Sequence, residues 1–207
     1  MPLFKEWNIG PHALAAIWKV EEPESFFKEQ TGIESAIKND KRRIEHLAGR
    51  FLLKHLKQDF PLHEIGKDGH DKPRIEDNRY FFSISHSWPY IAAVIDPHKE
   101  AGIDIQTWNP RIREIQHKFL SPDEQRLFGN DLQLLTAAWT AKEAVYKWNG
   151  RRNVEFIADL PISFFEANPQ VNNISIFFKS FENPKIISIE NIINTDFTCS
   201  YILCAED

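Results

Sequence analysis

The sequence predicts an α+β protein, and three of its features support that class. Two segments, residues 39–60 and 132–150, repeat apolar residues at helical spacing. Short apolar runs bounded by Gly, Pro, Asn and Asp lie on both sides of each helix and are typical of strands. The 207 residues suffice for one large domain or two small halves. This order of predicted helices and strands allows two similar halves that meet near residue 100, although no repeat in the sequence proves that they are related.

The first half is expected to contain a strand in HALAAIWKVEE, from His12, and a short helix after Pro23. Its strongest helix lies at residues 39–60, where apolar residues recur on one side. A loop rich in Gly, Asp and Lys then leads to an apolar strand at residues 80–95. The candidates for the N-cap of the long helix are Asn39 and Asp40.

The second half is expected to begin with a short buried strand, EAGIDIQ, after the turn at Asp96-Pro97. The sequence SPDEQRLF predicts a helix start, because Ser121 and Glu124 have the spacing of a capping box. A second long helix, residues 132–150, ends at a glycine. The remaining apolar runs predict three or four strands.

Composition narrows the class of protein. An apolar content of 42% with 27% charged residues is typical of a soluble globular chain. A net charge of −5 gives no global attraction to nucleic acid or to an anionic membrane. The first residues lack the basic and apolar pattern of a signal peptide, and no run approaches 18 apolar residues. We therefore expect a cytoplasmic protein that binds neither nucleic acid nor membrane.

The apolar stretch YFFSISHSWPYIAAVI is interrupted by Ser85, His86 and Ser87. Adjacent residues on a strand point to opposite faces, so Ser85 and His86 are poorly placed to act as a nucleophile and its base. The sequence also lacks a Gly-x-Ser-x-Gly elbow. Hydroxyl, imidazole and backbone N–H groups at a strand end are better suited to bind an anion. The alternative is that His86 has only a structural function.

A second group of polar residues predicts a metal site. Asp104 lies inside an apolar strand, where a carboxylate is costly unless it is paired or bound to a cation. In the second long helix, Glu143 and Lys147 are four residues apart and share one side. One Asp and one Glu on separate elements suit a Mg²⁺ ion that keeps waters and binds phosphates. The alternative is that Glu143 and Lys147 form an ordinary surface ion pair.

Five motifs, in order, resemble those of the 4′-phosphopantetheinyl transferase superfamily, in its single-chain, two-half, surfactin-synthetase-activating form. The resemblance extends over about residues 42–150, roughly half of the chain. The combination of Gly-Ile-Asp-Ile with Trp-x-x-Lys-Glu-Ala-x-x-Lys is highly specific. The motifs are KP at 72–73, FFSISHS at 81–87, GIDIQ at 102–106, FLSPDE at 119–124 and WTAKEAVYKWNG at 139–150.

The resemblance implies an enzyme that transfers the 4′-phosphopantetheine arm of coenzyme A to a serine of an apo acyl or peptidyl carrier protein, releasing 3′,5′-ADP. It implies two similar α/β halves in a pseudo-twofold arrangement, with coenzyme A and the metal between them. The expected halves are residues 1–100, which grip the 3′-phosphate, and residues 101–207, which carry the metal and catalytic residues. The implied metal is Mg²⁺ or Mn²⁺, and a monomer is expected.

By the same resemblance, the first half holds the phosphates of coenzyme A. Ser85 and His86 would grip them from the end of a strand, with Lys72 on the same anion. The 3′-phosphate is the natural target of these three groups together. Arg50, in the helix sequence RIEHLAGR, is a further candidate.

In the second half, Asp104 and Glu143 match the metal ligands of the family, and Lys147 matches the lysine that stabilises the leaving phosphate. The sequence departs from many members at Gln106, where they carry an acid. A Gln amide oxygen can ligate Mg²⁺ but adds no charge, so Gln106 is an optional ligand. The expected catalytic residues are Glu143, Lys147 and His86.

The carrier partner poses an electrostatic problem, since carriers are usually acidic around their modified serine and this chain is itself net negative. Attraction must therefore be local, and NPRIREIQHKFLSPDEQ offers basic residues beside apolar ones. The alternative is a connecting helix whose charges face water. The basic residues are Arg111, Arg113, His117 and Lys118, and the apolar ones are Ile112, Ile115, Phe119 and Leu120.

Two rival functions share part of this pattern. A non-catalytic coenzyme A-binding protein would keep the phosphate-binding residues and lose the metal acids. A Mg²⁺-dependent phosphohydrolase of another family would keep the acids without the Ser-His-Ser and Trp-x-x-Lys-Glu motifs.

Overall fold

The chain forms two compact units, Met1–Ala101 and Gly102–Asp207. The computed structural model describes residues 2–150, 153–167, 172–179 and 184–206. Each unit combines an antiparallel sheet with one long helix of 17 residues, so the predicted mixed class of helices and sheets is confirmed. Within the described ranges, no helix is long and apolar enough to cross a membrane.

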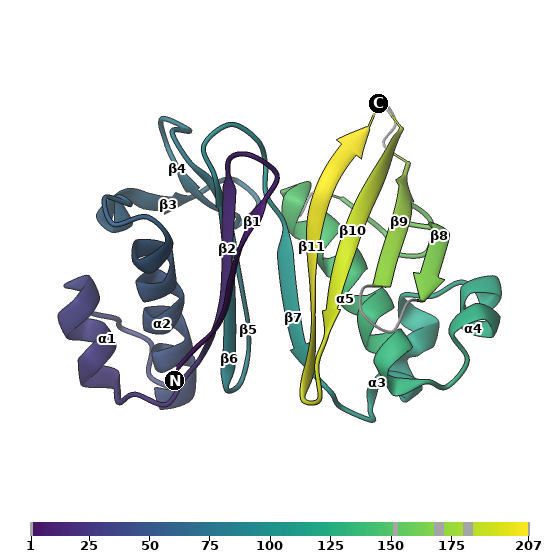
Figure 1. Ribbon diagram of the computed structural model, residues 1–207, viewed down its shortest axis with the longest axis horizontal. Helices are drawn as coiled ribbons and strands as arrows, with labels where there is room; N and C mark the ends of the chain where they lie inside the picture. The colour runs from purple at the N-terminus through teal and green to yellow at the C-terminus, as the bar shows by residue number, and fades with distance from the viewer. Residues whose placement is uncertain (1, 151–152, 168–171, 180–183, 207) are drawn as a thin grey trace. The chain divides into compact units, whose positions relative to one another are not determined.

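Unit 1 is a four-stranded antiparallel sheet with the order β1-β2-β6-β5, and helix α2 packs on it (Figure 1). A short helix, α1, packs against α2, and strands β3 and β4 form a separate two-stranded ribbon. The elements are β1 Leu3–Ile9, β2 Ala13–Lys19, α1 Glu24–Thr31, α2 Asp40–Leu56, η1 Leu62–Glu64, β3 Ile65–Lys67, β4 Pro73–Ile75, β5 Phe81–Ser87 and β6 Tyr90–Asp96.

Two strands of unit 1 differ from the prediction. Residues 80–95 form a hairpin, β5 and β6, and not one strand, because the chain turns at Trp88-Pro89 and pairs Phe81 with Asp96. Strand β1 was not predicted, since Lys, Glu and Asn interrupt the apolar residues of its LFKEWNI sequence and most of its side chains are not buried. It is an edge strand that pairs only with β2, so it buries little and leaves no apolar run in the sequence.

Helix α2 begins as predicted, with the Asn39 side chain accepting a hydrogen bond from the Arg42 backbone N–H at 3.0 Å. It ends at Leu56, before the predicted residue 60, because Lys57 is already extended. Its apolar side includes Leu47, Ala48, Leu52 and Leu53, all fully buried between the helix and the sheet. Burial of a leucine contributes about 1.5–3 kcal/mol, so this helix face is a main source of stability for unit 1.

Unit 2 is a five-stranded antiparallel sheet with the order β7-β11-β10-β9-β8. Helix α5 packs on β7, β11 and β10, and Figure 1 shows it against one face of this sheet. The elements are β7 Ile103–Thr107, α3 Ile112–Ile115, η2 Gln116–Lys118, α4 Pro122–Phe128, α5 Leu132–Trp148, β8 Ile162–Ala167, β9 Asn172–Phe178, β10 Lys185–Ile193 and β11 Phe197–Glu206.

The capping box predicted for the helix after residue 121 is present. The Ser121 hydroxyl accepts from the Glu124 backbone N–H, and the Glu124 carboxylate accepts from the Ser121 backbone N–H at 2.7 Å. The next helix, α5, is capped by Asp131, which accepts from two backbone N–H groups. Both caps satisfy N–H groups that have no partner inside their helices.

Gly102 lies where the start of β7 comes closest to α5. A Cβ atom added to it would overlap the backbone oxygen of Ala144 and lie 2.8 Å from the Cβ of Trp148. Neither backbone oxygen nor Cβ can move aside without moving the helix. Glycine at this position therefore permits the close packing of α5 on β7.

We expect Gly102→Ala to destabilise the protein by about 1–3 kcal/mol, the usual cost of overpacking a filled core. Urea unfolding followed by circular dichroism measures it. Gly69→Ala is the matched control, because a Cβ there has no heavy atom within 4 Å. Equal midpoints for Gly102→Ala and Gly69→Ala would show that α5 can shift without cost.

Candidate active site

An ion pair joins the two main elements of unit 2. The Lys147 ammonium, near the end of α5, lies 2.6 Å from Asp104 Oδ1 on β7. Both side chains are largely shielded from solvent, with exposed fractions of 12% and 8%. The structure therefore brings together two residues that the sequence analysis assigned to one site, and it supplies the partner that a buried carboxylate on a strand requires.

A chain of buried hydroxyl and amide groups lies on the same face of the sheet. Asp104 pairs across the ladder with Ser200 of β11. The Ser200 hydroxyl lies 2.5 Å from the Thr140 hydroxyl of α5 and donates to the Asn191 side chain of β10. The three residues are at most 1% exposed. These contacts fix the middle of α5 over β11, one strand away from Asp104.

Glu143 lies on α5 between these two anchor points. It is half-buried and precedes Lys147 by four residues, so the two share the side of the helix that faces β7. Gln106 shares a strand face with Asp104, two residues along β7. The Gln106 amide donates to the Thr107 carbonyl at 3.0 Å. Two carboxylates and one amide oxygen are hard ligands of the kind that Mg²⁺ and Mn²⁺ accept, with waters completing the shell.

A metal ion at this site would need ligands besides the side chains of this chain. In the part of the chain that the structure describes, no group of three or more His, Cys, Asp and Glu side chains is placed to hold a metal ion. A Mg²⁺ ion usually takes one or two carboxylates and completes its octahedron with waters and substrate phosphates. The donors Asp104 and Glu143 fit that pattern, in which the substrate supplies part of the shell.

Lys142 directly precedes Glu143, and the sequence alone indicated no function for it. It is fully buried, and its ammonium is 2.9 Å from the Glu124 carboxylate. Burial lowers the pKa of Lys142, while the hydrogen bond to Glu124 opposes that shift. The signal in the sequence was the lysine inside the apolar pattern of the helix, which required a buried acidic partner.

In unit 1, three basic side chains gather on α2 and β5. Arg50 and His46 lie on the helix, and His86 lies on the strand with its ring nitrogen 3.3 Å from the Glu45 carboxylate. Burial lowers the pKa of His46, and the charges of Arg50 and His86 lower it further. Burial also lowers the pKa of Arg50. An anion placed here would relieve the repulsion among the three, so they form a candidate phosphate site.

Ser85 and Lys72 are the remaining predicted phosphate contacts, and their surroundings differ from those of the three basic residues on α2 and β5. Ser85 is buried, and it points to the face of β5 opposite His86, which is half-exposed and reaches α2. The structure therefore does not bring the Ser85 hydroxyl and the His86 imidazole to the same face. This placement agrees with the expectation that the two are poorly placed to act as a nucleophile and its base.

Lys72 is almost fully buried, and its ammonium lies 2.7 Å from the Glu100 carboxylate. Arg74 contacts the same carboxylate at 2.7 Å and also contacts Asp68. Burial lowers the pKa of Lys72, opposed by Glu100. Lys72 therefore belongs to an ion-pair network within unit 1, and any phosphate that it binds must share it with Glu100.

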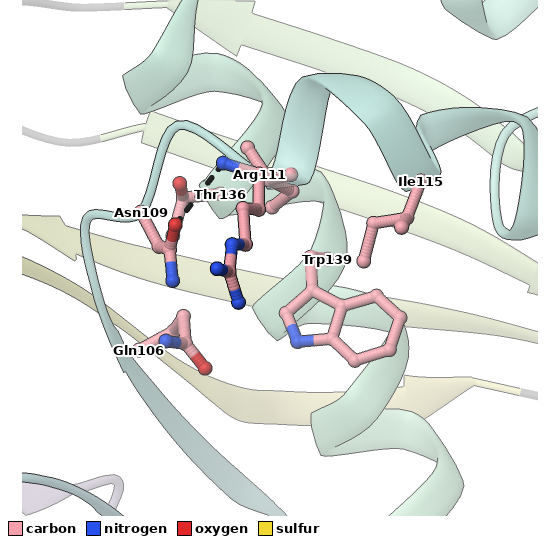
Figure 2. A pocket seen from close by; sticks show the side chains of 7 residues that line it. Gln106, Asn109, Arg111, Ile115, Thr136 and Trp139 are labelled. Atoms are coloured by element: carbon pink, nitrogen blue, oxygen red, sulfur yellow. Dashed lines mark hydrogen bonds between the residues drawn. The ribbon is translucent and has the colours of Figure 1, made fainter.

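Unit 2 also contains a cavity of about 200 Å³ between α3, α5 and the end of β7. Figure 2 shows the Arg111 guanidinium directed between Gln106 and Trp139. The backbone N–H of Arg111 donates to the Asn109 side chain at 3.0 Å, which holds the turn that precedes α3. The cavity is lined by Gln106, Asn109, Arg111, Ile112, Ile115, Thr136 and Trp139.

The apolar part of the predicted carrier-binding stretch needs correction. Phe119 and Leu120 are fully buried and Ile112 is 6% exposed, so they support α5 and cannot present a docking surface. Phe119 packs against Trp139 with ring centroids 5.1 Å apart. Ile115 is exposed, and so are the basic residues of the stretch, which are Arg111, Arg113, His117 and Lys118.

Comparison with protein families matches residues 100–202 to the 4′-phosphopantetheinyl transferase superfamily. The chain is 29% identical over 133 residues to the 4′-phosphopantetheinyl transferase AcpT of Escherichia coli K12, and equally to that of strain O157:H7. These alignments cover 58% of the chain and 64% of each relative. It is 31% identical over 113 residues to enterobactin synthase component D of Salmonella typhimurium, which covers 52% of the chain and 48% of that relative.

The buried contact between Asp104 and Lys147, with Glu143 one turn before Lys147 on α5, marks the candidate active site of unit 2. The chain belongs to the 4′-phosphopantetheinyl transferase superfamily, as the motifs of the sequence predicted. It matches less than two thirds of the length of the curated relatives named above.

The charge of the unit 1 cluster predicts a dependence of stability on pH. Because the pKa of His46 is lowered in the folded protein from 6.5, the unfolded chain takes up a proton first as the pH falls. The stability of the folded protein therefore falls below about pH 6.5, and well above that pH His46 causes no loss of stability. His46→Gln, which removes the titrating group, should lose less stability between about pH 7 and pH 5 than the unchanged protein. Urea midpoints at both pH values measure this difference. An equal loss of stability in His46→Gln and in the unchanged protein would contradict the lowered pKa of His46.

Proposed function

We propose that this protein transfers the 4′-phosphopantetheine arm of coenzyme A to a serine of an apo acyl or peptidyl carrier protein, releasing 3′,5′-ADP. The observation that carries the proposal is the buried contact between Asp104 and Lys147, with Glu143 one turn before Lys147 on the same side of α5. Membership of the superfamily and the names of the two kinds of relative support it.

In the proposed reaction, the serine oxygen of the carrier forms a bond to the phosphorus that bears the pantetheine. The bond from that phosphorus to the oxygen of 3′,5′-ADP breaks. Glu143 accepts the serine proton, which makes the serine oxygen a better nucleophile as its bond to phosphorus forms. The negative charge that collects on the leaving phosphate is stabilised by Lys147, and His86 is the proposed second cation.

Asp104 holds Lys147 in place for this step. An ammonium has three N–H donors, and one is directed to Asp104 Oδ1 at 2.6 Å. Asp104 and Glu143 would also hold Mg²⁺ or Mn²⁺, with Gln106 as an optional ligand, and the bound ion would neutralise phosphate oxygens and orient the reacting phosphorus. Positioning and charge stabilisation carry the reaction, since no covalent enzyme intermediate is involved.

The proposed coenzyme A site uses the cations of unit 1. The 3′-phosphate would be bound by His86 and Arg50, whose charges both act on His46, with His46 as an additional donor. Lys72 and Ser85 are further proposed contacts. The pseudo-twofold arrangement of two similar halves, with coenzyme A and the metal between them, belongs to this proposal, as do the monomeric state and the cytoplasmic location.

The carrier protein is proposed to approach unit 2 at the basic residues beside the cavity. Arg111 and Ile115 both line the cavity and are exposed, so an acidic helix could meet a charge and an apolar contact at one place. Arg113 is less free to move, because its guanidinium donates to the Asn130 carbonyl at 2.9 Å. The apolar contact is small, which makes electrostatic attraction the main contribution.

One experiment separates the proposed function from its rivals. The protein is incubated with coenzyme A, Mg²⁺ and a panel of apo carrier proteins, and each carrier is measured by intact mass spectrometry. A transferase adds the mass of one phosphopantetheine arm and produces an equal amount of 3′,5′-ADP. A non-catalytic coenzyme A-binding protein leaves every carrier unchanged, and a phosphohydrolase consumes coenzyme A without modifying a carrier.

Removal of the acidic pair should abolish transfer. Asp104→Ala and Glu143→Ala are each expected to lower kcat by about a hundredfold or more, as for loss of a general base or of a metal ligand. Glu114→Ala, an exposed acid on α3, is the control. Gln106→Ala should be mild. Turnover close to that of the unchanged protein for Glu143→Ala would contradict the mechanism.

Two substitutions test the 3′-phosphate contacts. His86→Ala and Lys72→Ala should raise the KM for coenzyme A about tenfold, because a charge-assisted hydrogen bond to phosphate contributes about 1.5–3 kcal/mol. They should raise the KM for 3′-dephospho-coenzyme A much less. Alanine at the exposed His63 is the control. Equal losses for both substrates would show that His86 and Lys72 do not recognise the 3′-phosphate.

Charge reversal tests the carrier surface. Arg111→Glu combined with Arg113→Glu should slow association with the carrier and reduce its dependence on salt, with little change in coenzyme A affinity. Lys5→Glu with Lys57→Glu makes the same change in net charge on unit 1. Stopped-flow association at low and high salt is the measurement. An unaltered carrier KM at low salt for the first pair would place docking elsewhere.

A further inference from the structure

The ammonium of Lys142 contacts three separate segments of unit 2. It donates to the Phe119 carbonyl at 2.8 Å and to the Phe156 carbonyl at 3.1 Å. It also donates to both carboxylate oxygens of Glu124, at 2.9 and 3.1 Å. Lys142 is 0% exposed. Its three N–H groups are therefore fully engaged inside the protein, and no substrate atom can reach them.

Glu124 is equally well satisfied. Besides Lys142, its carboxylate accepts from the Ser121 backbone N–H at 2.7 Å and from the Ile162 backbone N–H at 2.8 Å. The first contact closes the capping box of α4, and the second holds the start of β8. A single carboxylate thus joins the beginnings of α4 and β8 to the middle of α5.

A buried ion pair of this kind is poorly explained by stability alone. Two charges taken from water lose much of their hydration, and well-packed apolar residues often replace such a pair at no cost in stability. The pair instead fixes the orientation of the Lys142 side chain, because its hydrogen bonds to carbonyl groups determine where that side chain can lie. This restricts both the rotation of α5 about its axis and its position along that axis.

The restricted part of α5 is the part that carries the proposed catalytic groups. Glu143 is the next residue after Lys142, and Lys147 follows just over one turn later. On the other side of the helix, Thr140 contacts Ser200 of the sheet. Glu143 therefore lies one residue after the buried anchor Lys142 and three residues after Thr140. A small rotation of α5 would move its carboxylate relative to Asp104 of β7.

We propose that the Lys142–Glu124 ion pair is a positioning device for the metal site, holding Glu143 at the distance from Asp104 at which both bind one divalent cation. The inference rests on the proposed function, in which these two carboxylates ligate the metal. It assigns the lysine of the Trp-x-x-Lys-Glu motif and the acid of the Ser-Pro-Asp-Glu motif to one task. Neither residue contacts substrate.

The test removes the pair and measures metal binding as well as turnover. Lys142→Met alone leaves the Glu124 carboxylate buried without its cation, which is strongly destabilising and can prevent folding. Lys142→Met combined with Glu124→Gln removes both charges and keeps an oxygen for the Ser121 and Ile162 N–H groups. The affinity for Mn²⁺ is measured by electron paramagnetic resonance in the presence of coenzyme A, corrected for Mn²⁺ bound by coenzyme A alone.

The double variant should fold, as judged by circular dichroism and a cooperative thermal transition, yet bind Mn²⁺ at least about tenfold more weakly, as when a group that orients a metal ligand is lost. Its kcat at limiting Mg²⁺ should fall, with partial recovery at high Mg²⁺ and little change in the KM for coenzyme A. Glu124→Asp keeps the charge but is shorter by one methylene. Its Mn²⁺ affinity should lie between those of the double variant and the unchanged protein. Tyr201→Phe removes a hydrogen bond to Glu190 from the other face of the sheet and should leave Mn²⁺ affinity unchanged.

A folded double variant with unchanged Mn²⁺ affinity and unchanged kcat would overturn the inference and leave the pair a purely structural one. Failure of the proposed function looks different, because the unchanged protein would then neither modify a carrier nor bind Mn²⁺ with coenzyme A. That second result would overturn both proposals, before any variant is compared.

Discussion

The packing of α5 on β7 is the constraint on which the candidate site depends. It places the Lys147 ammonium against the buried Asp104 carboxylate, and the missing side chain of Gly102 allows the helix to come this close. A carboxylate without such a partner would be strongly destabilising at this depth. The same partner orients both charges before any substrate binds, and preorganised charges stabilise a transition state more effectively than groups that must first rearrange.

The two units carry chemically different groups. Unit 1 gathers cations near α2 and β5, where Arg50 and His46 are partly shielded from water and repel one another. Unit 2 gathers carboxylates on β7 and α5. Cations suit the phosphate end of coenzyme A, and carboxylates suit a divalent metal and a proton acceptor. A net charge of −5 is compatible with the proposed anionic substrate because the positive groups are concentrated locally.

Buried polar contacts hold α5 in position at two places in unit 2. Thr140 with Ser200 joins α5 to the sheet, and Lys142 with Glu124 joins α5 to α4 and β8. Apolar packing alone permits neighbouring side-chain arrangements of similar energy, whereas a buried donor tolerates only positions that keep its acceptor. The polar contacts thus add precision to a core whose stability comes mainly from apolar burial.

The sequence by itself determined the elements whose signals are local. Helical spacing predicted α2 and α5, the Ser-Pro-Asp-Glu pattern predicted the cap of α4, and the motifs around Asp104 and Glu143 predicted the family. Such features depend on residues a few positions apart, so they are visible without a fold.

Only the tertiary structure decided what depends on distant partners. Edge strand β1 has no apolar run, so its pairing with β2 left no signal in the sequence. Phe119 and Leu120 looked suited to a docking surface and are core residues instead, because α5 covers them. The pairing of Lys142 with Glu124 spans 18 positions. A sequence shows that a buried charge needs a partner, but which of many acids meets it is decided by the path of the chain between them.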